Sequence, residues 1–103
     1  MMVDVVILSN CTSGEYFDVN RNCVESLLAS EPEISFNIII VESNPEFRKL
    51  GLSYGISCVT IISPNEPFHF NRFLNIGLAA TTCDWVVFSN NDVTFHSGWF
   101  RRY

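Results

Sequence analysis

A short polar segment follows an uncharged apolar run late in the chain, and it carries the residue types best suited to chemistry. The run is Trp85 to Ser89, and the segment is Asn90-Asn91-Asp92. An apolar run of this length favours a strand buried on both faces, as in a parallel sheet. In open α/β sheets, ligands bind just beyond the carboxyl ends of the strands. A carboxylate flanked by amides there can hold a hard divalent cation and, through it, a phosphate group.

Asp92 is the candidate metal ligand. Magnesium and manganese usually bind through one or two carboxylates, with waters and substrate phosphates completing the shell. One aspartate is therefore enough when a diphosphate supplies the other oxygens. The alternative is that Asp92 only caps the following turn, since aspartate is a favoured capping residue. His96 lies four residues further on, in what looks like an ordinary loop.

Polar residues also follow the other apolar runs of the chain. They are Ser9 and Asn10, then Glu42, Ser43 and Asn44, then Ser63 and Asn65. Loops favour serine and asparagine in any case, which accounts for part of this pattern. It accounts less well for Glu42 and Asp92, because each acid comes at or just after the end of an apolar strand. In a parallel sheet these polar ends gather along one edge.

Alternating strands and helices must position these residues. The pattern predicts strands at residues 3–9, 36–41, 56–62 and 84–89, and helices at 18–30, 46–50 and 69–81. Asp18 is the expected cap of the first helix, with Val19, Cys23 and Leu27 on its inner face. Such alternation implies right-handed crossovers and a mostly parallel sheet in a three-layer α/β/α, Rossmann-like fold.

The last predicted helix carries a polar stripe formed by Asn71, Arg72 and Asn75, which are three or four residues apart. Arginine can grip a phosphate or a carboxylate with two donors. The alternative is a solvated helix face, since exposed asparagine and arginine are common. The apolar face of this helix is expected to contain Phe70, Phe73, Leu74, Gly77 and Leu78.

Composition limits the class of protein. The chain has 103 residues, of which 48% are hydrophobic and 17% charged, so we expect one globular domain. The net charge of −5 argues against nucleic acid as a partner, since there is no basic stripe. No apolar run approaches the ~20 residues that span a bilayer, and no basic segment resembling a signal peptide opens the chain.

The cysteines and histidines indicate neither a zinc site nor a nucleophilic triad. Cys11, Cys23, Cys58 and Cys83 form no CxxC pair, and Cys23, Cys58 and Cys83 lie in apolar surroundings. We expect structural thiols in a reducing cytoplasm. His69 is expected to start a helix or to pack. The glycines form no GxGxxG motif and no P-loop.

Several motifs together resemble one enzyme family. They are Cys23-Val24-Glu25-Ser26-Leu27 in a helix, Glu42-Ser43-Asn44 after a strand, Asn75-Ile76-Gly77, Ser89-Asn90-Asn91-Asp92, and Gly98-Trp99. In this order they resemble the nucleotide-binding half of glycosyltransferase family 2, which has the GT-A fold. The segment from Phe70 to Gly77 with Val86 to Asp92 is also similar to galactosyltransferases of the lactose-synthase type.

The resemblance implies a glycosyltransferase of hexosyltransferase type, acting by inversion on a nucleoside-diphosphate sugar, with a UDP-sugar favoured. The acceptor would be a glycan or another hydroxyl compound. The resemblance implies manganese or magnesium as cofactor, held by Asp92. Residues implied at the nucleotide sugar are Ser9, Asn10, Glu42, Asn71, Arg72, Asn75, Asn90 and Asn91. The chain departs from the family pattern at Asn90, often Asp, and at Glu42, more usually Asp.

No catalytic base is identified, because the family's base and acceptor-binding half lie beyond the metal motif. We therefore expect residues 1–103 to form a single domain that is an N-terminal fragment of a longer enzyme, binding donor but transferring sugar poorly. Trp99, Phe100 and Tyr103 form an apolar C-terminus that invites pairing, so a homo-oligomer is expected. One alternative is a non-catalytic nucleotide-binding or interaction module on the same scaffold. A second alternative is a flavodoxin-like or receiver-like signalling domain, which would need an acidic cluster after the first strand, where this chain has Ser9-Asn10-Cys11.

Overall fold

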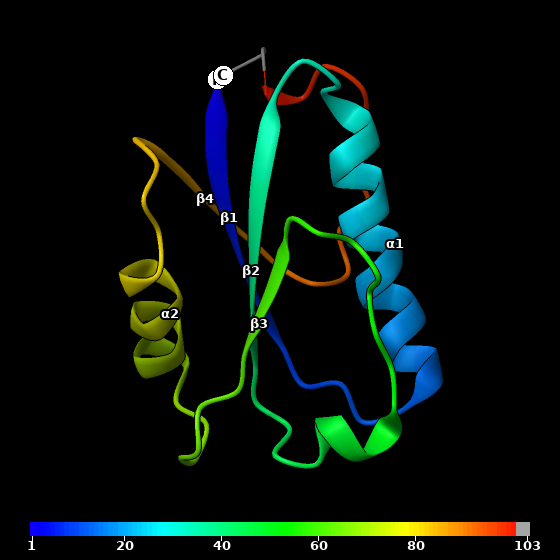
Figure 1. Cartoon of the computed structure of the whole chain (residues 1–103), viewed down its shortest axis with the longest axis vertical. Coiled ribbons are helices and arrows are strands. Elements are labelled where there is room, and N and C mark those ends of the chain that lie inside the picture. The colour runs from blue at the N-terminus through cyan, green and yellow to red at the C-terminus, as the bar shows by residue number, and fades with distance from the viewer. Residues whose placement is uncertain (101–103) are drawn as a thin grey trace.

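The computed structural model describes residues 1–100 and contains a parallel sheet with helices on both faces (Figure 1). The sheet order is β3-β2-β1-β4, and every neighbouring pair is parallel. The α/β class and the three-layer arrangement are confirmed. The elements are β1 (Met2–Ser9), α1 (Gly14–Ser30), β2 (Ser35–Glu42), the 3-10 helix η1 (Phe47–Leu50), β3 (Val59–Ile62), α2 (Phe70–Ala79) and β4 (Trp85–Ser89).

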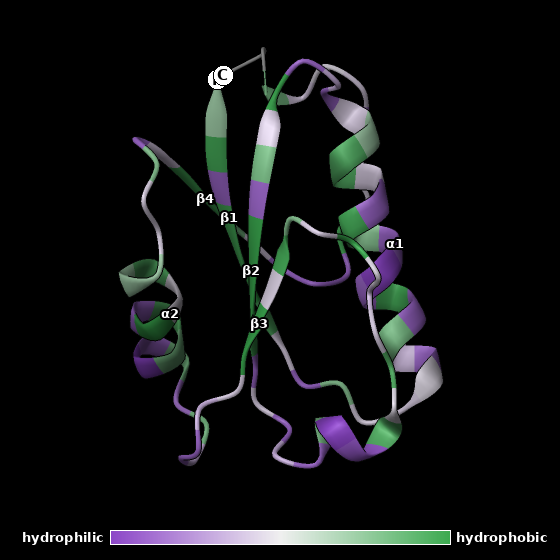
Figure 2. Cartoon of the chain, viewed as in Figure 1, coloured by the Kyte–Doolittle hydropathy of each residue, from purple (hydrophilic) through white to green (hydrophobic). Residues whose placement is uncertain are grey.

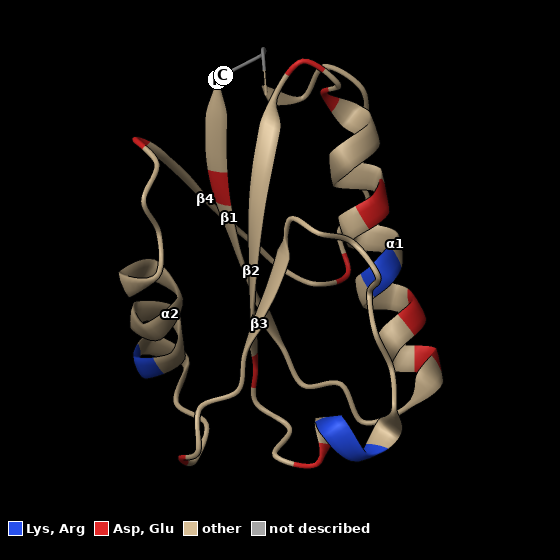
Figure 3. Ribbon diagram, viewed as in Figure 1, with Lys and Arg blue, Asp and Glu red and all other residues tan. Residues whose placement is uncertain are grey.

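Strand register brings the polar strand ends together. Ser9 at the end of β1 pairs with Glu42 at the end of β2, and Ile7 pairs with Ser89 at the end of β4. The carboxyl ends of all strands meet at one edge because parallel strands run in one direction. Within the four described strands, Asp4 and Glu42 are the only charged residues, and the other charges of residues 1–100 lie on helices and connecting loops (Figure 3).

Two apolar cores lie on the two faces of the sheet, because side chains alternate along each strand. The face under α1 contains Val3, Val5 and Ile7 together with inward residues of the helix. The opposite face packs against α2 through Phe73, which is fully buried. Apolar colour follows the strands in Figure 2, whereas the connecting loops are largely polar.

Close packing of α2 depends on a glycine. A Cβ built at Gly77 would lie 2.5 Å from Val6 Cγ1 and 3.0 Å from Val41 Cγ2. The helix backbone can therefore approach β1 and β2 only because position 77 has no side chain. Phe73 and Gly77 are buried as expected, but Phe70 and Leu78 from the predicted apolar face are exposed.

Asp4 anchors the turn between α2 and β4. Its carboxylate accepts hydrogen bonds from the backbone N–H groups of Thr82 and Cys83 and from Asn37 Nδ2, each at 2.7 Å. Burial raises the pKa of Asp4, but the hydrogen bonds from Cys83, Asn37 and Thr82 outweigh it. The net effect is a pKa below the ordinary value.

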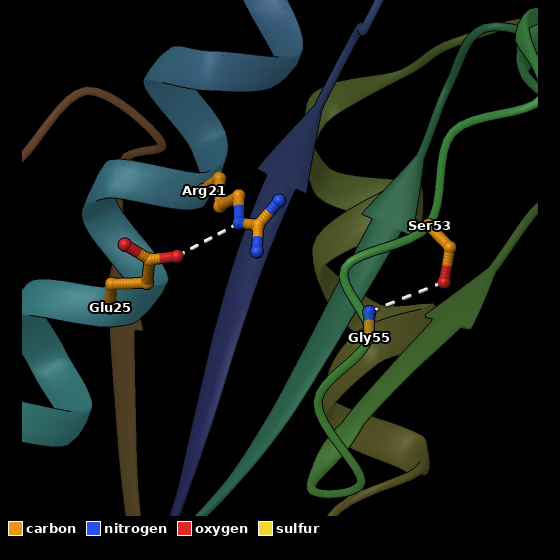
Figure 4. Close-up of polar contacts among 4 residues, drawn as sticks. All are labelled: Arg21, Glu25, Ser53 and Gly55. Carbon is orange, nitrogen blue, oxygen red and sulfur yellow. Dashed lines mark hydrogen bonds and ion pairs between the residues drawn. The ribbon is translucent and has the colours of Figure 1, made fainter.

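The first helix starts earlier than predicted. It begins at Gly14 rather than near Asp18, because Ser13 is the N-cap and its hydroxyl accepts from the Tyr16 N–H at 3.2 Å. The predicted inner position of Val19 was wrong, since this side chain is 45% exposed. On the outer face, Arg21 and Glu25 form an exposed ion pair at 2.8 Å (Figure 4). Such a pair adds little stability.

The fourth strand was predicted to be buried on both faces, and this was wrong. It is an edge strand, and Trp85, Val86 and Phe88 are exposed. The apolar composition of a strand does not reveal its position in the sheet, and that position determines whether its side chains are buried. The third strand starts at Val59 and not at residue 56, because residues 51–58 form an irregular loop.

The C-terminal aromatic residues pack on the domain itself. Trp99 stacks on Phe36 with ring centroids 6.4 Å apart, and its indole N–H donates to Ser30 Oγ at 2.7 Å. Phe100 contacts Trp99 edge-on. Tyr103, expected in this cluster, lies outside the described residues. Within residues 1–100, no helix has the length and apolar character needed to cross a membrane.

Candidate functional site

A pocket of about 320 Å³ lies at the carboxyl edge of the sheet. Its walls come from residues that end or follow β1, β2 and β4, together with two exposed aromatic rings. The lining residues are Leu8, Ser9, Asn10, Tyr16, Ser43, Phe68 and Asn91. Polar groups with flat apolar rings beside them suit a ligand that has hydroxyl groups and an aromatic base.

Three of the predicted site residues line this pocket: Ser9, Asn10 and Asn91. Sequence reasoning missed Tyr16 and Phe68 as part of the site. Tyr16 belongs to the first turn of α1, which lies before the predicted helix start at Asp18, and Phe68 precedes α2. A predicted helix start at Gly14 would have placed Tyr16 in the first turn of the helix, close to the carboxyl end of the first strand.

Glu42 organises the ends of β1 and β2. Its side chain is 1% exposed and accepts three hydrogen bonds. Ser9 Oγ donates to Oε1 at 2.7 Å, and the N–H groups of Cys11 and Asn44 donate to Oε2 at 2.9 Å each. The carboxylate thereby fixes two loops next to the pocket without lining it. Contact between Glu42 and a nucleoside stays a prediction.

Asn20 joins two walls of the pocket from behind. It is 2% exposed on α1, and its Nδ2 donates to Ser9 Oγ at 2.7 Å and to the Tyr54 hydroxyl at 3.2 Å. Its Oδ1 accepts from Asn91 Nδ2 at 2.8 Å. Sequence reasoning missed this residue. The available signal was spacing, because Asn20 lies three residues before Cys23 and seven before Leu27, on the inner face.

Tyr54, in the loop before β3, is the last member of the hydrogen-bond network around Asn20. Burial raises its pKa to about 12, and the hydrogen bond from Asn20 lowers it by less. The chain turns around this residue because Ser53 Oγ accepts from the Gly55 N–H at 3.2 Å, as Figure 4 shows. Gly55 has a φ of 65°, which favours glycine. Tyr54 is therefore a neutral, fixed hydrogen-bonding group.

The segment after β4 is held by α1. Asn91 bonds to Asn20, the Asn90 carbonyl accepts from Cys23 Sγ at 3.6 Å, and the Phe95 N–H donates to Ser26 Oγ at 3.0 Å. Asn90 and Asp92 are exposed. Residues 1–100 contain no group of three or more His, Cys, Asp or Glu side chains arranged for a metal. Asp92 and the neighbouring amide oxygens fit a hard cation as a partial site only, which a bound diphosphate would have to complete.

The polar stripe of α2 is exposed. Arg72 pairs with Glu66 at 2.8 Å, and this hydrogen bond raises the pKa of the guanidinium. Asn71 and Asn75 are also exposed and, like Arg72, are not part of the pocket lining. The role of this stripe at a nucleotide sugar stays a prediction.

The thiols and histidines at this edge offer no activated nucleophile among the described residues. Cys11 is buried, and both burial and the nearby Glu42 raise the pKa of its thiol. His69 is the N-cap residue of α2 but makes no side-chain cap bond, and His96 is exposed. All four cysteines are free, with Cys11 and Cys23 buried and Cys58 and Cys83 half-buried.

The order of elements and the residues at the sheet edge agree with a comparison against protein families. The profile of glycosyl transferase family 2 matches residues 10–103. No curated protein matches the chain closely enough to count as a relative. The match begins at the end of β1 and covers both helices, the remaining strands and the segment around Asp92. The chain therefore belongs to glycosyl transferase family 2.

Proposed function

We propose that this chain binds a nucleoside-diphosphate sugar, favoured as a UDP-sugar, together with manganese or magnesium. In the proposed reaction the sugar passes with inversion to the hydroxyl group of a glycan or similar acceptor. The observation that carries the proposal is the pocket at the carboxyl edge of the parallel sheet, which is lined by Asn91, the residue directly before Asp92. Open α/β sheets bind nucleotides at this edge.

The pocket residues offer two kinds of contact, aromatic stacking and hydrogen bonding. Tyr16 and Phe68 present exposed aromatic rings that suit stacking with a base. Asn91 commits an N–H to Asn20, so its carbonyl oxygen is available to accept from a ribose hydroxyl or a base N–H. Asn10 is exposed at the rim and offers both a donor and an acceptor.

Charge on the diphosphate needs a separate partner. Asp92 would hold the divalent cation, and the bound cation would neutralise charge that develops on the departing diphosphate. Arg72 would approach the phosphates, for which it must exchange its exposed bond to Glu66. That exchange costs little because the ion pair is solvated. We assign no catalytic base.

A pocket-filling variant tests the location of the nucleotide. Asn10→Trp adds a large ring at an exposed position of the lining, so it should block UDP without harming the fold. Thr60→Trp, at an exposed position on β3, is the control. We expect calorimetric titration of UDP with manganese to give wild-type affinity for Thr60→Trp and no measurable binding for Asn10→Trp. Equal affinity in both variants would place the nucleotide elsewhere.

The second candidate is a nucleotide-binding module of the same family that does not turn over. It is favoured by the single carboxylate at the proposed cation position and by the lack of a three-ligand cluster within residues 1–100. Labelled UDP-sugar separates the two functions. Release or transfer of the sugar by the wild-type chain, even when slow, that falls further in Asp92→Asn supports the enzyme. Binding of the donor without any release supports the module.

The proposed compartment is the cytoplasm. Four free cysteines, two of them buried, are the state expected in a reducing environment. A homo-oligomer is proposed through the apolar C-terminus, where Phe100 contacts Trp85, together with the adjoining edge strand β4, where Trp85 and Phe88 are accessible. Sedimentation of the chain across a range of concentrations tests this point.

A further inference from the structure

Asn20 is an unusual residue for its place in the fold. Asparagine is a poor helix former, and a buried amide is costly unless its donors and acceptor are all engaged. Here Asn20 lies in the second turn of α1 and is 2% exposed, yet it makes hydrogen bonds to Ser9, Tyr54 and Asn91. An apolar residue would pack at this position as its neighbours Cys23, Val24 and Leu27 do. The amide instead connects three partners, Ser9, Tyr54 and Asn91, that an apolar side chain could not bond.

The direction of each hydrogen bond follows from Glu42. The carboxylate accepts the single hydroxyl proton of Ser9, so Ser9 Oγ must act as acceptor toward Asn20. The NH₂ group of Asn20 therefore faces Ser9, and its carbonyl oxygen faces Asn91. The result is a directed chain of hydrogen bonds that runs from Asn91 through Asn20 and Ser9 to Glu42.

This chain spans the pocket walls. Ser9 and Asn91 both line the pocket, one at the end of β1 and the other just after β4, while Asn20 lies behind them. Asn91 directly precedes Asp92 in the sequence. The bond from Asn91 to Asn20 thus sets both the separation of the two walls and the start of the segment that carries Asp92.

We propose that Asn20 is a positioning residue for the nucleotide site, holding Asn91 and the following Asp92 against the end of β1. This role rests on the proposed function, because it concerns the same pocket. Asn20 touches no ligand itself. It acts by keeping the Asn91 side chain and backbone in one arrangement before the nucleotide arrives, which reduces the ordering cost of binding.

The test uses one variant and two controls. Asn20→Leu keeps the branched shape and the number of heavy atoms of the side chain, and it removes every hydrogen bond of the amide. Val24→Ala truncates a fully buried apolar residue on the same helix and reports loss of stability alone. Asn22→Ala removes an exposed amide that bonds to Thr94 Oγ1 at 3.2 Å, in the same segment but outside the pocket lining.

The first readout needs no ligand. Hydrogen exchange of the Asn91 side-chain amide, whose Nδ2 bonds to Asn20 Oδ1 at 2.8 Å, is measured at a pH where all variants are folded. It should be about tenfold faster in Asn20→Leu, as loss of one ~1.4 kcal/mol hydrogen bond implies. Val24→Ala and Asn22→Ala should keep wild-type exchange there. Unchanged exchange in Asn20→Leu would overturn the proposal, whatever the chain binds.

The second readout is the affinity for UDP with manganese. It should fall about tenfold in Asn20→Leu, the equivalent of one such hydrogen bond, and stay unchanged in both controls. Faster exchange with unchanged affinity would overturn the positioning role. An equal loss in Val24→Ala would also overturn it, by assigning the effect to stability. If the wild-type chain binds no nucleotide, the proposed function fails, while the exchange data still decide whether Asn20 holds the segment.

Discussion

Replacing Glu42 with glutamine tests whether the carboxylate organises the site. Glu42→Gln changes one oxygen into NH₂ and leaves the shape of the side chain almost unaltered. The two backbone N–H donors, from Cys11 and Asn44, share Oε2, so the remaining carbonyl oxygen of the amide will face them. The new NH₂ group must then face Ser9 Oγ, which at present donates to this position.

The change propagates because Ser9 has one hydroxyl proton. Once Ser9 accepts from residue 42, its proton has two places to go. It turns into the pocket, which Ser9 lines, while Asn20 keeps its orientation. Alternatively it turns toward Asn20, and then Asn20 and Asn91 both turn their amides over, which replaces an acceptor of Asn91 by a donor in the pocket. In either case a substitution outside the pocket lining changes the hydrogen-bonding polarity of a pocket residue.

The energetic cost follows from the number of bonds. Hydrogen bonds to a charged group contribute about 1.5–3 kcal/mol and neutral ones about 0.5–1.5, so each of three bonds weakens by roughly 1 kcal/mol. Relief of the burial cost of the charge offsets part of this. We expect a loss of about 2 kcal/mol in the free energy of unfolding, or a fall of about 10 °C in Tm for a domain of this size.

The assay is thermal and urea unfolding at pH 7, with side-chain amide NMR signals of asparagine as a second readout. Glu25→Gln is the control, since Glu25 forms only an exposed ion pair, and it should change stability by less than about 0.5 kcal/mol. The Asn20 and Asn91 amide signals should shift in Glu42→Gln and not in the control. A Tm for Glu42→Gln that matches Glu25→Gln would refute the reasoning.

Three further predictions concern the frame of the site. The folded-state pKa of Asp4 lies below the ordinary value of 3.8, so its contribution to stability is present above that value and is lost as pH falls through the folded pKa. Urea midpoints of the wild-type chain should therefore fall more steeply below pH 4 than those of Asp4→Asn. Gly77→Ala should cost about 1–3 kcal/mol because the new Cβ meets a β1 methyl group at 2.5 Å, whereas Gly14→Ala, with nothing within 4 Å, should be nearly neutral in thermal unfolding. Glu66→Gln should release Arg72 and strengthen UDP binding, whereas Arg72→Ala should weaken it, with both measured by calorimetry. Equal affinities would remove Arg72 from the proposed site.

The fold was predictable because each strand body is a short apolar run and each connection is long enough for a crossover. The location of the candidate site, at the carboxyl edge of the sheet, was also predictable, because polar residues follow each apolar run. The burial of β4 was not predictable. Its five residues, Trp85–Ser89, have the apolar composition of a central strand. In the sheet order β3-β2-β1-β4, however, β4 pairs only with β1 and lies at an edge. Strand order depends on packing between distant segments.

The missed part of the site lies on α1. Ser13 and Gly14 lie before the helix start predicted at Asp18, whereas in the structure the Tyr16 N–H donates to the Ser13 hydroxyl and caps the helix there. The late start assigned to the helix put Asn20 near its first turn, where asparagine is common. With the observed start, Asn20 falls on the buried face. The error in one helix boundary therefore concealed the residue that links the pocket walls.

One titration tests the central claim most directly. UDP is added to the wild-type chain, to Asp92→Asn and to Asp84→Asn, each with and without manganese. Asp84 is an exposed aspartate just before β4, at the opposite edge of the sheet, and is the matched control. The account predicts that manganese strengthens UDP binding in the wild type and in Asp84→Asn. In Asp92→Asn manganese no longer strengthens binding. The affinity for UDP with manganese is then about tenfold or more below that of the wild type, as loss of one charge-assisted contact implies. Binding of equal strength in all three chains, or manganese dependence that survives in Asp92→Asn, would contradict a nucleotide site centred on Asp92.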